Sequence, residues 1–304
     1  MTNQSKQAPG SPGHTPHWTS SAKSGICKAV NALSNVSVTI SHGILNEIYY
    51  PREDEACTRE MELIVSDGKD FFSEEKWDTA HATNMVPDGI PAYQIVNKSL
   101  QGRYRIEKKV IADPLRDTVL QKIRFVPLKG SRADYHLYVM LVPHLGNQGA
   151  GNTAWTGNYK GTSMLFAARN NLAVALCCSE PWIKRSVGFV GVSDGLTDIR
   201  QHKQMTWEYQ RAENGNVAMV AEIDLSQEEE EFTLALGFGR NHIEAGHHAL
   251  ASITSGFDSA YERYVAEWQK WQKSLSPSWT LKDDIGKFSS VSSAILRMHE
   301  SKHF

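Results

Sequence analysis

From about residue 36 to residue 240, this chain is a succession of short runs in which apolar and polar side chains alternate. Alternation with a period of two residues is typical of a β-strand with one buried face. Turn signals such as SDG at 66–68 separate the runs. About a dozen strands without intervening helices predict an antiparallel sandwich rather than a parallel α/β sheet. The candidate strands are VSVTI, ILNEIYY, MELIV, AYQIV, RYRIEKKVI, HLYVMLV, MLFAA and LAVALCC.

Other runs extend the pattern toward residue 240. Trp207 and Tyr209 flank Glu208, which predicts a further strand there. Two more runs each place four apolar residues on one face of a strand. They are Val217, Met219, Ala221 and Ile223, and then Phe232, Leu234, Leu236 and Phe238.

The periodicity changes after about residue 250. Apolar and aromatic residues recur there at spacings of three and four, which predicts an amphipathic helix with Ser255 as its N-cap and Pro277 as its stop. This stripe is Phe257, Tyr261, Tyr264, Trp268, Trp271 and Leu275. A second stripe, Phe288, Val291, Ile295 and Met298, starts another helix shortly before the sequence ends at Phe304. We expect its partner surface to lie in a following domain.

The composition excludes several classes of protein. Hydrophobic residues make up 40% and charged residues 22% of the 304 residues, and the net charge is −2. This balance gives no reason to expect a nucleic acid or a membrane as a partner. The four cysteines, which include the adjacent Cys177 and Cys178, form no C-x-x-C motif, and we expect them to be buried and reduced. The first 25 residues lack the apolar centre of a secretory signal, so we expect a cytoplasmic protein.

Two histidine clusters resemble metal sites, but we interpret neither as one. The segment 299–303 satisfies H-E-x-x-H, but catalytic zinc needs a third protein ligand, and only one residue follows. His242, Glu244, His247 and His248 are interpreted as a surface loop. We therefore expect no metal and no cofactor.

Motifs for other chemistries are equally weak. The loop at 146–152 contains Gly146, Gly149 and Gly151, but the turn-rich segment TAWTGNYKG that follows is not helical, as a dinucleotide fingerprint would require. No nucleophile motif is present, and nothing singles out a catalytic pair of carboxylates.

The most unusual segment is SHGILNEIYYPREDEACTRE, at 41–60. It combines polar groups on a strand with paired tyrosines, a combination that suits a rim in contact with sugar, because aromatic faces stack on pyranose rings and carboxylates bind hydroxyls. A strand and turn with a buried polar network is the alternative interpretation. The candidate rim residues are His42, Asn46, Glu47, Tyr49, Tyr50, Arg52 and Asp54.

Several segments resemble the N-terminal domain of bacterial glucoamylases and glucodextranases of glycoside hydrolase family 15. The resemblance covers nearly the whole chain. The segments that carry it are 12–26 (PGHTPHWTSSAKSGI), 39–60, 113–125 (DPLRDTVLQKIRF), 143–155 (PHLGNQGAGNTAW), 187–195 (VGFVGVSDG), 234–240 (LALGFGR) and 292–304.

This resemblance implies a mainly β fold, a large antiparallel supersandwich similar to that of galactose mutarotase. A linker helix and an (α/α)6 barrel would follow, and the barrel would hydrolyse α-glucosidic bonds with inversion, using two glutamates beyond Phe304. We accordingly expect a supersandwich at 1–254, a linker helix at 255–277 and the start of a truncated barrel at 278–304. The implied partners are an α-glucan, a maltooligosaccharide or dextran, and the missing barrel.

Two other functions remain open from the sequence. A free-standing carbohydrate-binding module would bind maltooligosaccharide or dextran by itself. A mutarotase-like epimerase would need a His/Glu acid–base pair, for which His136, His144 and Glu208 are the candidates.

Overall fold

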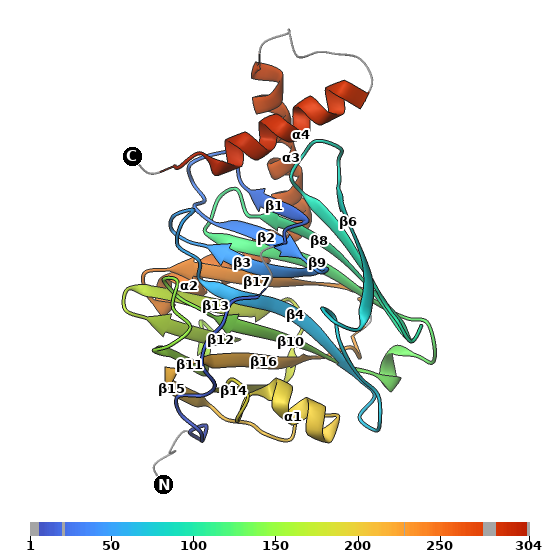
Figure 1. Ribbon diagram of the computed structural model, residues 1–304, viewed down its shortest axis with the longest axis vertical. Coiled ribbons are helices and arrows are strands. Elements are labelled where there is room, and N and C mark those ends of the chain that lie inside the picture. Colours follow the sequence, from blue (N-terminus) through green and yellow to red (C-terminus); the bar gives the residue numbers. More distant parts are fainter. Residues whose placement is uncertain (1–5, 20–21, 228, 276–283, 303–304) are drawn as a thin grey trace.

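The computed structural model describes residues 6–19, 22–227, 229–275 and 284–302, and these form two large antiparallel sheets with helices outside them (Figure 1). The eight-stranded sheet has the order β1-β2-β3-β4-β10-β16-β14, with β5 paired to β4. Its strands are β1 (Gly25–Lys28), β2 (Ser37–Ser41), β3 (Ile44–Tyr49), β4 (Thr58–Ser66), β5 (Phe72–Glu74), β10 (His136–Pro143), β14 (Trp182–Phe189) and β16 (Val217–Ile223).

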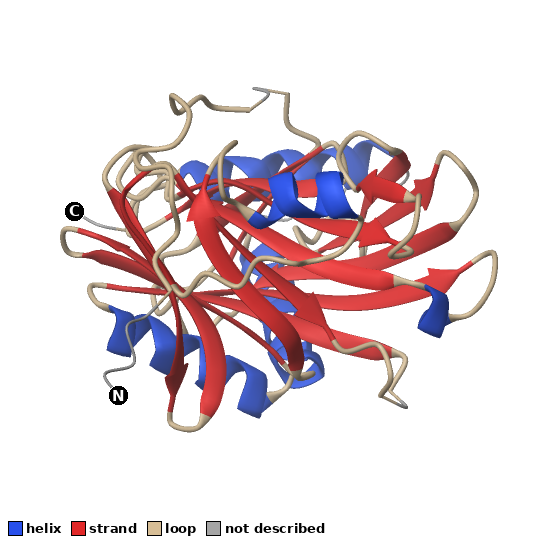
Figure 2. Cartoon of the chain, turned by 90° about the horizontal axis from the view of Figure 1, so that it is seen from below, coloured by secondary structure: helices blue, strands red, loops and turns tan. Residues whose placement is uncertain are grey.

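The nine-stranded sheet has the order β15-β11-β12-β13-β17-β9-β8-β7-β6. Seen along the long axis of the molecule, the strands are strongly twisted (Figure 2). The strands are β6 (Thr79–Met85), β7 (Tyr93–Ser99), β8 (Tyr104–Ala112), β9 (Thr118–Pro127), β11 (Asn152–Tyr159), β12 (Thr162–Arg169), β13 (Leu172–Cys178), β15 (Arg211–Gly215) and β17 (Glu231–Gly239). This architecture confirms the predicted mainly β sandwich.

The main core fills the space between the two sheets. Strand β16 shows how the alternation builds it: Met219 and Ala221 belong to this core, whereas Ala218 and Val220 lie on the opposite face in a second, smaller cluster. All four cysteines are buried and free, and burial raises the pKa of Cys27 to about 12, so its thiol stays protonated at neutral pH. The cytoplasmic location stays a prediction.

The helices lie outside the sheets, and no helix of the described part is long and apolar enough to span a membrane. They are the 3-10 helix η1 (Arg132–Asp134), α1 (Gly195–His202), α2 (His242–Ser255), α3 (Phe257–Ser274) and α4 (Asp284–His299). In Figure 1, α1 lies near one end of the long axis, and α3 and α4 stand at the other.

The predicted amphipathic helix is confirmed as α3, and its aromatic stripe packs on the sandwich. Trp268 is fully buried, and its indole N–H donates to the carbonyl oxygen of Lys28 at 3.1 Å. The hydroxyl of Tyr264 lies 2.9 Å from the carbonyl oxygens of both Lys28 and Pro91. These contacts attach α3 to the end of β1 and to the loop before β7.

The predicted cap of this helix was wrong. Ser255 is the last residue of α2, and Gly256, with φ of +82°, is the N-cap of α3. Glycine adopts this backbone conformation without the steric penalty of a side chain. The predicted stop, Pro277, lies outside the described residues. The division of the chain at 254 and 277 stays a prediction.

Two helices were missed. The interpretation of His242–His248 as a loop was wrong, because these residues form the first turns of α2, capped by Asn241. The residues that α2 buries are small, among them Ala245 and Ala249, so no stripe of large apolar side chains marks it. The second missed helix is α1, which begins at Gly195 and has Asp194 as its N-cap.

Two short segments also differ from expectation. Trp207 and Tyr209 lie in an extended connection before β15 and form no strand. The segment TAWTGNYKG, predicted to be turn-rich, is mostly strand β11 paired along its length with β12, and only Lys160 and Gly161 form the turn. Neighbouring strands stabilise both small and polar residues that carry little strand preference of their own.

The last helix buries only part of the predicted stripe. Met298 of the stripe joins the main core together with Ala294, which was not predicted, whereas Phe288 and Ile295 are exposed. Part of the partner surface that we expected in a following domain is therefore supplied by this chain itself.

Candidate functional site

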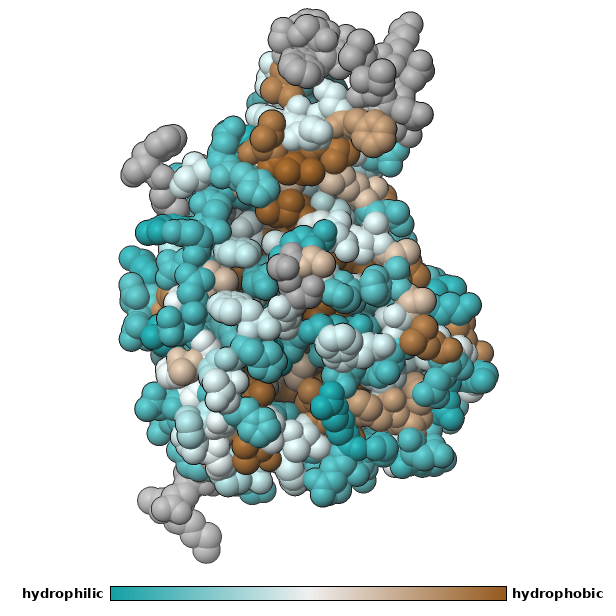
Figure 3. Space-filling view, viewed as in Figure 1, coloured by the Kyte–Doolittle hydropathy of each residue, from teal (hydrophilic) through white to brown (hydrophobic). Residues whose placement is uncertain are grey.

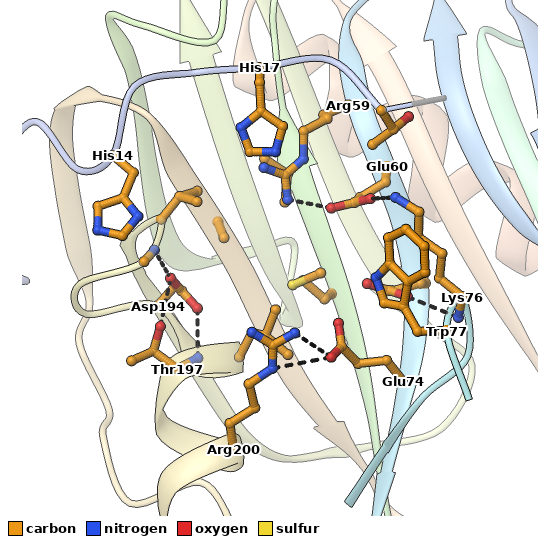
Figure 4. A pocket seen from close by; sticks show the side chains of 18 of the residues that line it. His14, His17, Arg59, Glu60, Glu74, Lys76, Trp77, Asp194, Thr197 and Arg200 are labelled. Atoms are coloured by element: carbon orange, nitrogen blue, oxygen red, sulfur yellow. Dashed lines mark hydrogen bonds and ion pairs between the residues drawn. The ribbon is translucent and has the colours of Figure 1, made fainter. Parts of the chain in front are cut away.

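A cavity of about 870 Å³ opens on the face of the eight-stranded sheet that points away from the main core. We call it the outer-sheet cavity; its lining includes His17, Trp18, Arg59, Glu60, Trp77 and Arg200. Figure 3 shows the hollow with apolar side chains at its floor. The N-terminal segment, the residues after β5, and α1 surround it (Figure 4).

The alternation in β4 places charges at this cavity. Met61 and Leu63 point into the main core, so Glu60 and Glu62 lie on the opposite face and line the cavity. The floor beside them is apolar and includes Met140 of β10. The neighbouring strands β4, β10 and β16 carry different residues on this outer face, so charged side chains lie beside an apolar floor.

Glu60 forms ion pairs with two cations. Arg59 binds one of its oxygens, and Lys76 Nζ lies 2.8 Å from the other. All three side chains are nearly buried. Burial alone would raise the pKa of Glu60, but the charges of Arg59 and Lys76 outweigh burial and lower it, so the carboxylate stays ionised.

Glu62 is a buried carboxyl group of the same strand. It is 3% exposed, and burial together with the charges of Glu60, Glu74 and Glu75 raises its pKa well above the ordinary value. A protonated carboxyl has an O–H group and can donate as well as accept a hydrogen bond. The raised pKa favours this protonated form, and Glu62 adds a hydrogen-bonding group to the lining.

The wall on the α1 side is also charge-paired. Arg200 of α1 binds Glu74 of β5, with Nε at 3.1 Å from the carboxylate. Asp194 caps α1 and accepts a hydrogen bond from the backbone N–H of Thr197 at 2.8 Å. These contacts fix α1 against the sheet and hold the Arg200 side chain at the cavity.

The N-terminal segment crosses the cavity as a fixed strap. The backbone N–H of His14 donates to Val190 at 2.9 Å, and Asn216 donates to the carbonyl oxygen of His14 at 3.0 Å. Trp18 packs edge-on against His144, with ring centroids 4.7 Å apart. Burial and the charge of Arg59 lower the pKa of His144 to about 4, so this imidazole is neutral.

The structure distributes the predicted rim residues over several places. His42 lines the outer-sheet cavity, in the turn between β2 and β3. Tyr49 lines a different hollow, of about 520 Å³, which α4 closes with Val291 and Met298. Asn46 and Glu47 are buried, and Glu47 forms an ion pair with Lys23.

The remaining rim candidates lie elsewhere. Tyr50 is buried, with its ring 5.5 Å from that of Phe238. Arg52 and Asp54 pair with each other in solvent. The seven residues do not converge on one site, and their role at a rim stays a prediction.

Sequence reasoning missed most of the cavity. Arg59 and Glu60 lie in the segment singled out at 41–60, but they were not among its candidates. Trp18 lies in the segment 12–26 that carries the family resemblance but was not a site candidate, and Lys76 and Trp77 carried no motif. A charge-rich stretch that begins at the last residue of the short strand β5, EEKW at 74–77, is the one local signal that could have indicated them.

The other candidates from the sequence do not form sites. His136 binds Glu222 at 2.6 Å, His144 packs under Trp18, and Glu208 is exposed, so no mutarotase-like acid–base pair assembles from them. His303 of the H-E-x-x-H match lies outside the described residues, and His299 bonds to the carbonyl oxygen of Ile295. Among the described residues, no group of three or more His, Cys, Asp or Glu could hold a metal ion.

Comparison with known proteins gives consistent matches. The family model described as glucodextranase, domain N, matches residues 8–273. A glucoamylase of Clostridium sp. (strain G0005) is 37% identical over 265 residues, which is 87% of this chain and 38% of that protein. A crystal structure of a bacterial glucoamylase complexed with acarbose is 34% identical, with a TM-score of 0.94, over 98% of this chain and 44% of that chain.

More distant structures share only the fold. An inverting mannosidase and an α-mannosidase of family GH92 from Bacteroides thetaiotaomicron are each 10% identical, with TM-scores of 0.51 and 0.53. The chain spans less than half the length of both glucoamylases. The resemblance found in the sequence is confirmed, and the chain belongs to the glucodextranase domain N family, as the N-terminal domain of a glucoamylase- or glucodextranase-type protein of glycoside hydrolase family 15.

Proposed function

We propose that this chain is the non-catalytic scaffold of an inverting exo-α-glucosidase that acts on α-glucans, of the glucan 1,4-α-glucosidase or glucodextranase type. In this function it supports folding of an (α/α)6 catalytic barrel and holds it in position. The observation that carries the proposal is the match to the bacterial glucoamylase, which extends over 98% of this chain with a TM-score of 0.94 but covers 44% of that chain. The complex of that glucoamylase with acarbose supports an α-glucan as the substrate class.

The end of the molecule that carries α3 and α4 is suited to hold a further domain. Lys28 Nζ donates to the carbonyl oxygens of Met298 and Glu300, at 3.2 and 2.8 Å, so the C-terminal end of α4 is attached to β1. Phe288 and Leu296, by contrast, are each 72% exposed on α4. An anchored helix with exposed apolar side chains can bury them against a second domain.

The carboxyl groups of this chain's own cavity support a non-catalytic assignment. An inverting glycosidase needs one carboxylic acid and one carboxylate that is free to activate water. Here Glu60 is held by two cations and Glu74 by Arg200. We therefore assign both catalytic carboxyls to the barrel that the family resemblance implies.

Glucose release tests the proposal. The 304 residues alone, and the same residues fused to the barrel region of the Clostridium glucoamylase, are incubated with maltotriose and with isomaltotriose. We expect release from the fusion only. The barrel region expressed by itself should give less soluble protein than the fusion, and co-expression with this chain should restore the yield. Sustained turnover by the 304 residues alone would overturn the proposal.

The segment 41–60 is part of the same proposal as a rim beside the barrel mouth. Tyr49 supports this placement, because it lines the hollow beside α4. A Tyr49→Ala fusion should keep its stability but show a higher KM for maltotriose. An unchanged KM would remove Tyr49 from the rim.

A further inference from the structure

We propose that the outer-sheet cavity is a second, non-catalytic binding site, that it takes an uncharged oligosaccharide of the α-glucan class, and that Trp77 and Trp18 are its stacking surfaces. The cavity itself is argued from its lining alone. The choice of α-glucan among the uncharged sugars rests on the proposed function.

The charges of the lining favour an uncharged ligand. The cations Arg59, Lys76 and Arg200 are matched by the anions Glu60 and Glu74, with which they pair, and by Asp194, which caps α1. Ligands with a net charge are recognised by unmatched charges of opposite sign. Because these charges are already paired, the lining offers hydrogen-bond donors and acceptors rather than a net charge.

The aromatic residues supply flat apolar surfaces at the mouth. Trp77 is 62% exposed and Trp18 is 42% exposed, although tryptophan is highly buried on average. The ammonium group of Lys76 lies 4.8 Å from the centre of the Trp77 ring, and His144 packs against Trp18. Both indoles are thus held in position while part of each faces solvent. Aromatic rings held in this way stack on the apolar faces of sugar rings.

Two buried polar atoms of the lining have no hydrogen-bond partner among the described residues. They are Nε of Arg59 and Oγ1 of Thr19. Arg59 is a nearly buried cation that extends toward the cavity from β4 (Figure 4). A buried donor without a partner is costly, and a ligand hydroxyl or the water that it orders would satisfy it. The buried carboxyl of Glu62 adds a further hydrogen-bonding group to the lining.

The size of the cavity is also appropriate. Its volume of about 870 Å³ lies within the roughly 300–1,000 Å³ typical of sites for organic ligands, and exceeds what a single ion would need. The apolar floor at Met140, Val142 and Ala218 can contact the C–H groups of a sugar while the wall binds its hydroxyls.

Isothermal titration of the 304-residue chain tests the site. Maltotriose and isomaltotriose are the probes, and mannotriose, cellotriose and inorganic phosphate are the comparisons. We expect one of the two α-glucan trisaccharides to bind with a dissociation constant of about 1 mM or tighter. The indole N–H signals of Trp77 and Trp18 in the NMR spectrum should shift during the same titration.

Matched tryptophan variants locate the site. Trp77→Ala should weaken binding at least about tenfold, because a stacking surface is lost. Trp182→Ala, on β14 outside the cavity lining, should leave the affinity unchanged. Circular dichroism confirms that each variant is folded.

Three results would overturn the proposal. The first is no binding of either α-glucan at about 20 mM, well above the expected dissociation constant. The second is binding that Trp77→Ala does not weaken, and the third is tighter binding of phosphate or of the other trisaccharides. None of these results would affect the glucose-release test of the fusion, so failure of this site and failure of the scaffold function are distinguishable.

Discussion

The helical end, where α3 and α4 cover β1, and the outer-sheet cavity both remove charged side chains from water, but they pair them differently. At the helical end, most partners are backbone carbonyl oxygens: Lys28 donates to those of Met298 and Glu300 and also pairs with Glu53, and Lys302 donates to those of Ala29 and Ser34. In the cavity, cations pair with carboxylates and the space beside them stays open. Hydrogen bonds to backbone carbonyl oxygens hold one segment against another. Ion pairs between side chains beside the open cavity instead form a polar surface that a ligand can reach.

The tryptophans differ between the two regions in the same way. Trp268 is fully buried under α3, and Trp77 is mostly exposed at the cavity. Burial of a large apolar side chain contributes to stability, while an exposed one contributes almost nothing. We therefore expect the helical end to determine stability and the cavity to determine binding.

The largest expected effect is that of Trp268→Ala. It leaves a cavity under α3 and removes the hydrogen bond to the carbonyl oxygen of Lys28, which should lower the free energy of unfolding by about 3–5 kcal/mol. Urea denaturation monitored by circular dichroism measures the change. Trp271→Ala, at a half-buried position of the same helix, is the control and should cost less. Equal effects would show that α3 is not clamped through Trp268.

The next effect is a pH dependence of stability at the buried His144, which lies outside the cavity lining and packs against Trp18. Burial lowers the pKa of His144 to about 4, from an ordinary value of 6.5. Between these values the unfolded chain binds the proton more readily than the folded chain, so stability is full above about pH 6.5 and falls toward pH 4, by about 3 kcal/mol. The denaturation midpoint, measured between pH 7 and pH 4.5, should therefore decrease for the natural chain.

A variant isolates this contribution. His144→Leu should flatten the decrease, because it keeps an apolar side chain beside Trp18 and removes the titrating group. His247→Leu, at an exposed position on α2, should leave the slope as it is. A His144→Leu variant with the original slope would mean that other groups cause the acid sensitivity.

A smaller effect is expected from Lys28→Met, which tests whether Lys28 attaches α4 to the sandwich. Methionine keeps the apolar stem but can neither donate to the carbonyl oxygens of Met298 and Glu300 nor pair with Glu53, and we expect a loss of about 2 kcal/mol. Amide hydrogen exchange should increase selectively in α4. Uniform exchange across α4 and the sheets would contradict the assigned role of Lys28.

The smallest effect on stability is expected from Trp77→Ala. The indole is mostly exposed, so the free energy of unfolding should change by no more than about 0.5 kcal/mol. The same denaturation experiment as for Trp268→Ala provides the direct comparison. A loss as large as that of Trp268→Ala would make Trp77 a structural residue and would remove the distinction between the two regions.

Local periodicity explains which parts of the fold could be predicted. The apolar faces of β16 and β17 and the aromatic stripe of α3 were visible because strand and helix place neighbouring residues at fixed spacings. Helix α2 escaped notice because it packs through small residues, Ala245 and Ala249, whose burial leaves no strong pattern. The sequence showed the apolar stripe on α4, but the contact of this helix with the sandwich decides which of its residues are buried.

The sequence by itself determined the strand-rich architecture, the clamping helix and the family, because each depends on patterns between residues that are near one another or on matched segments. Only the tertiary structure decided the outer-sheet cavity. Its charges come from β4 and α1, which are more than a hundred residues apart, and its aromatic residues from the N-terminal segment and the turn after β5. Such groups meet through sheet pairing and through the packing of a strap and a helix on one face, and no local spacing records those long-range contacts.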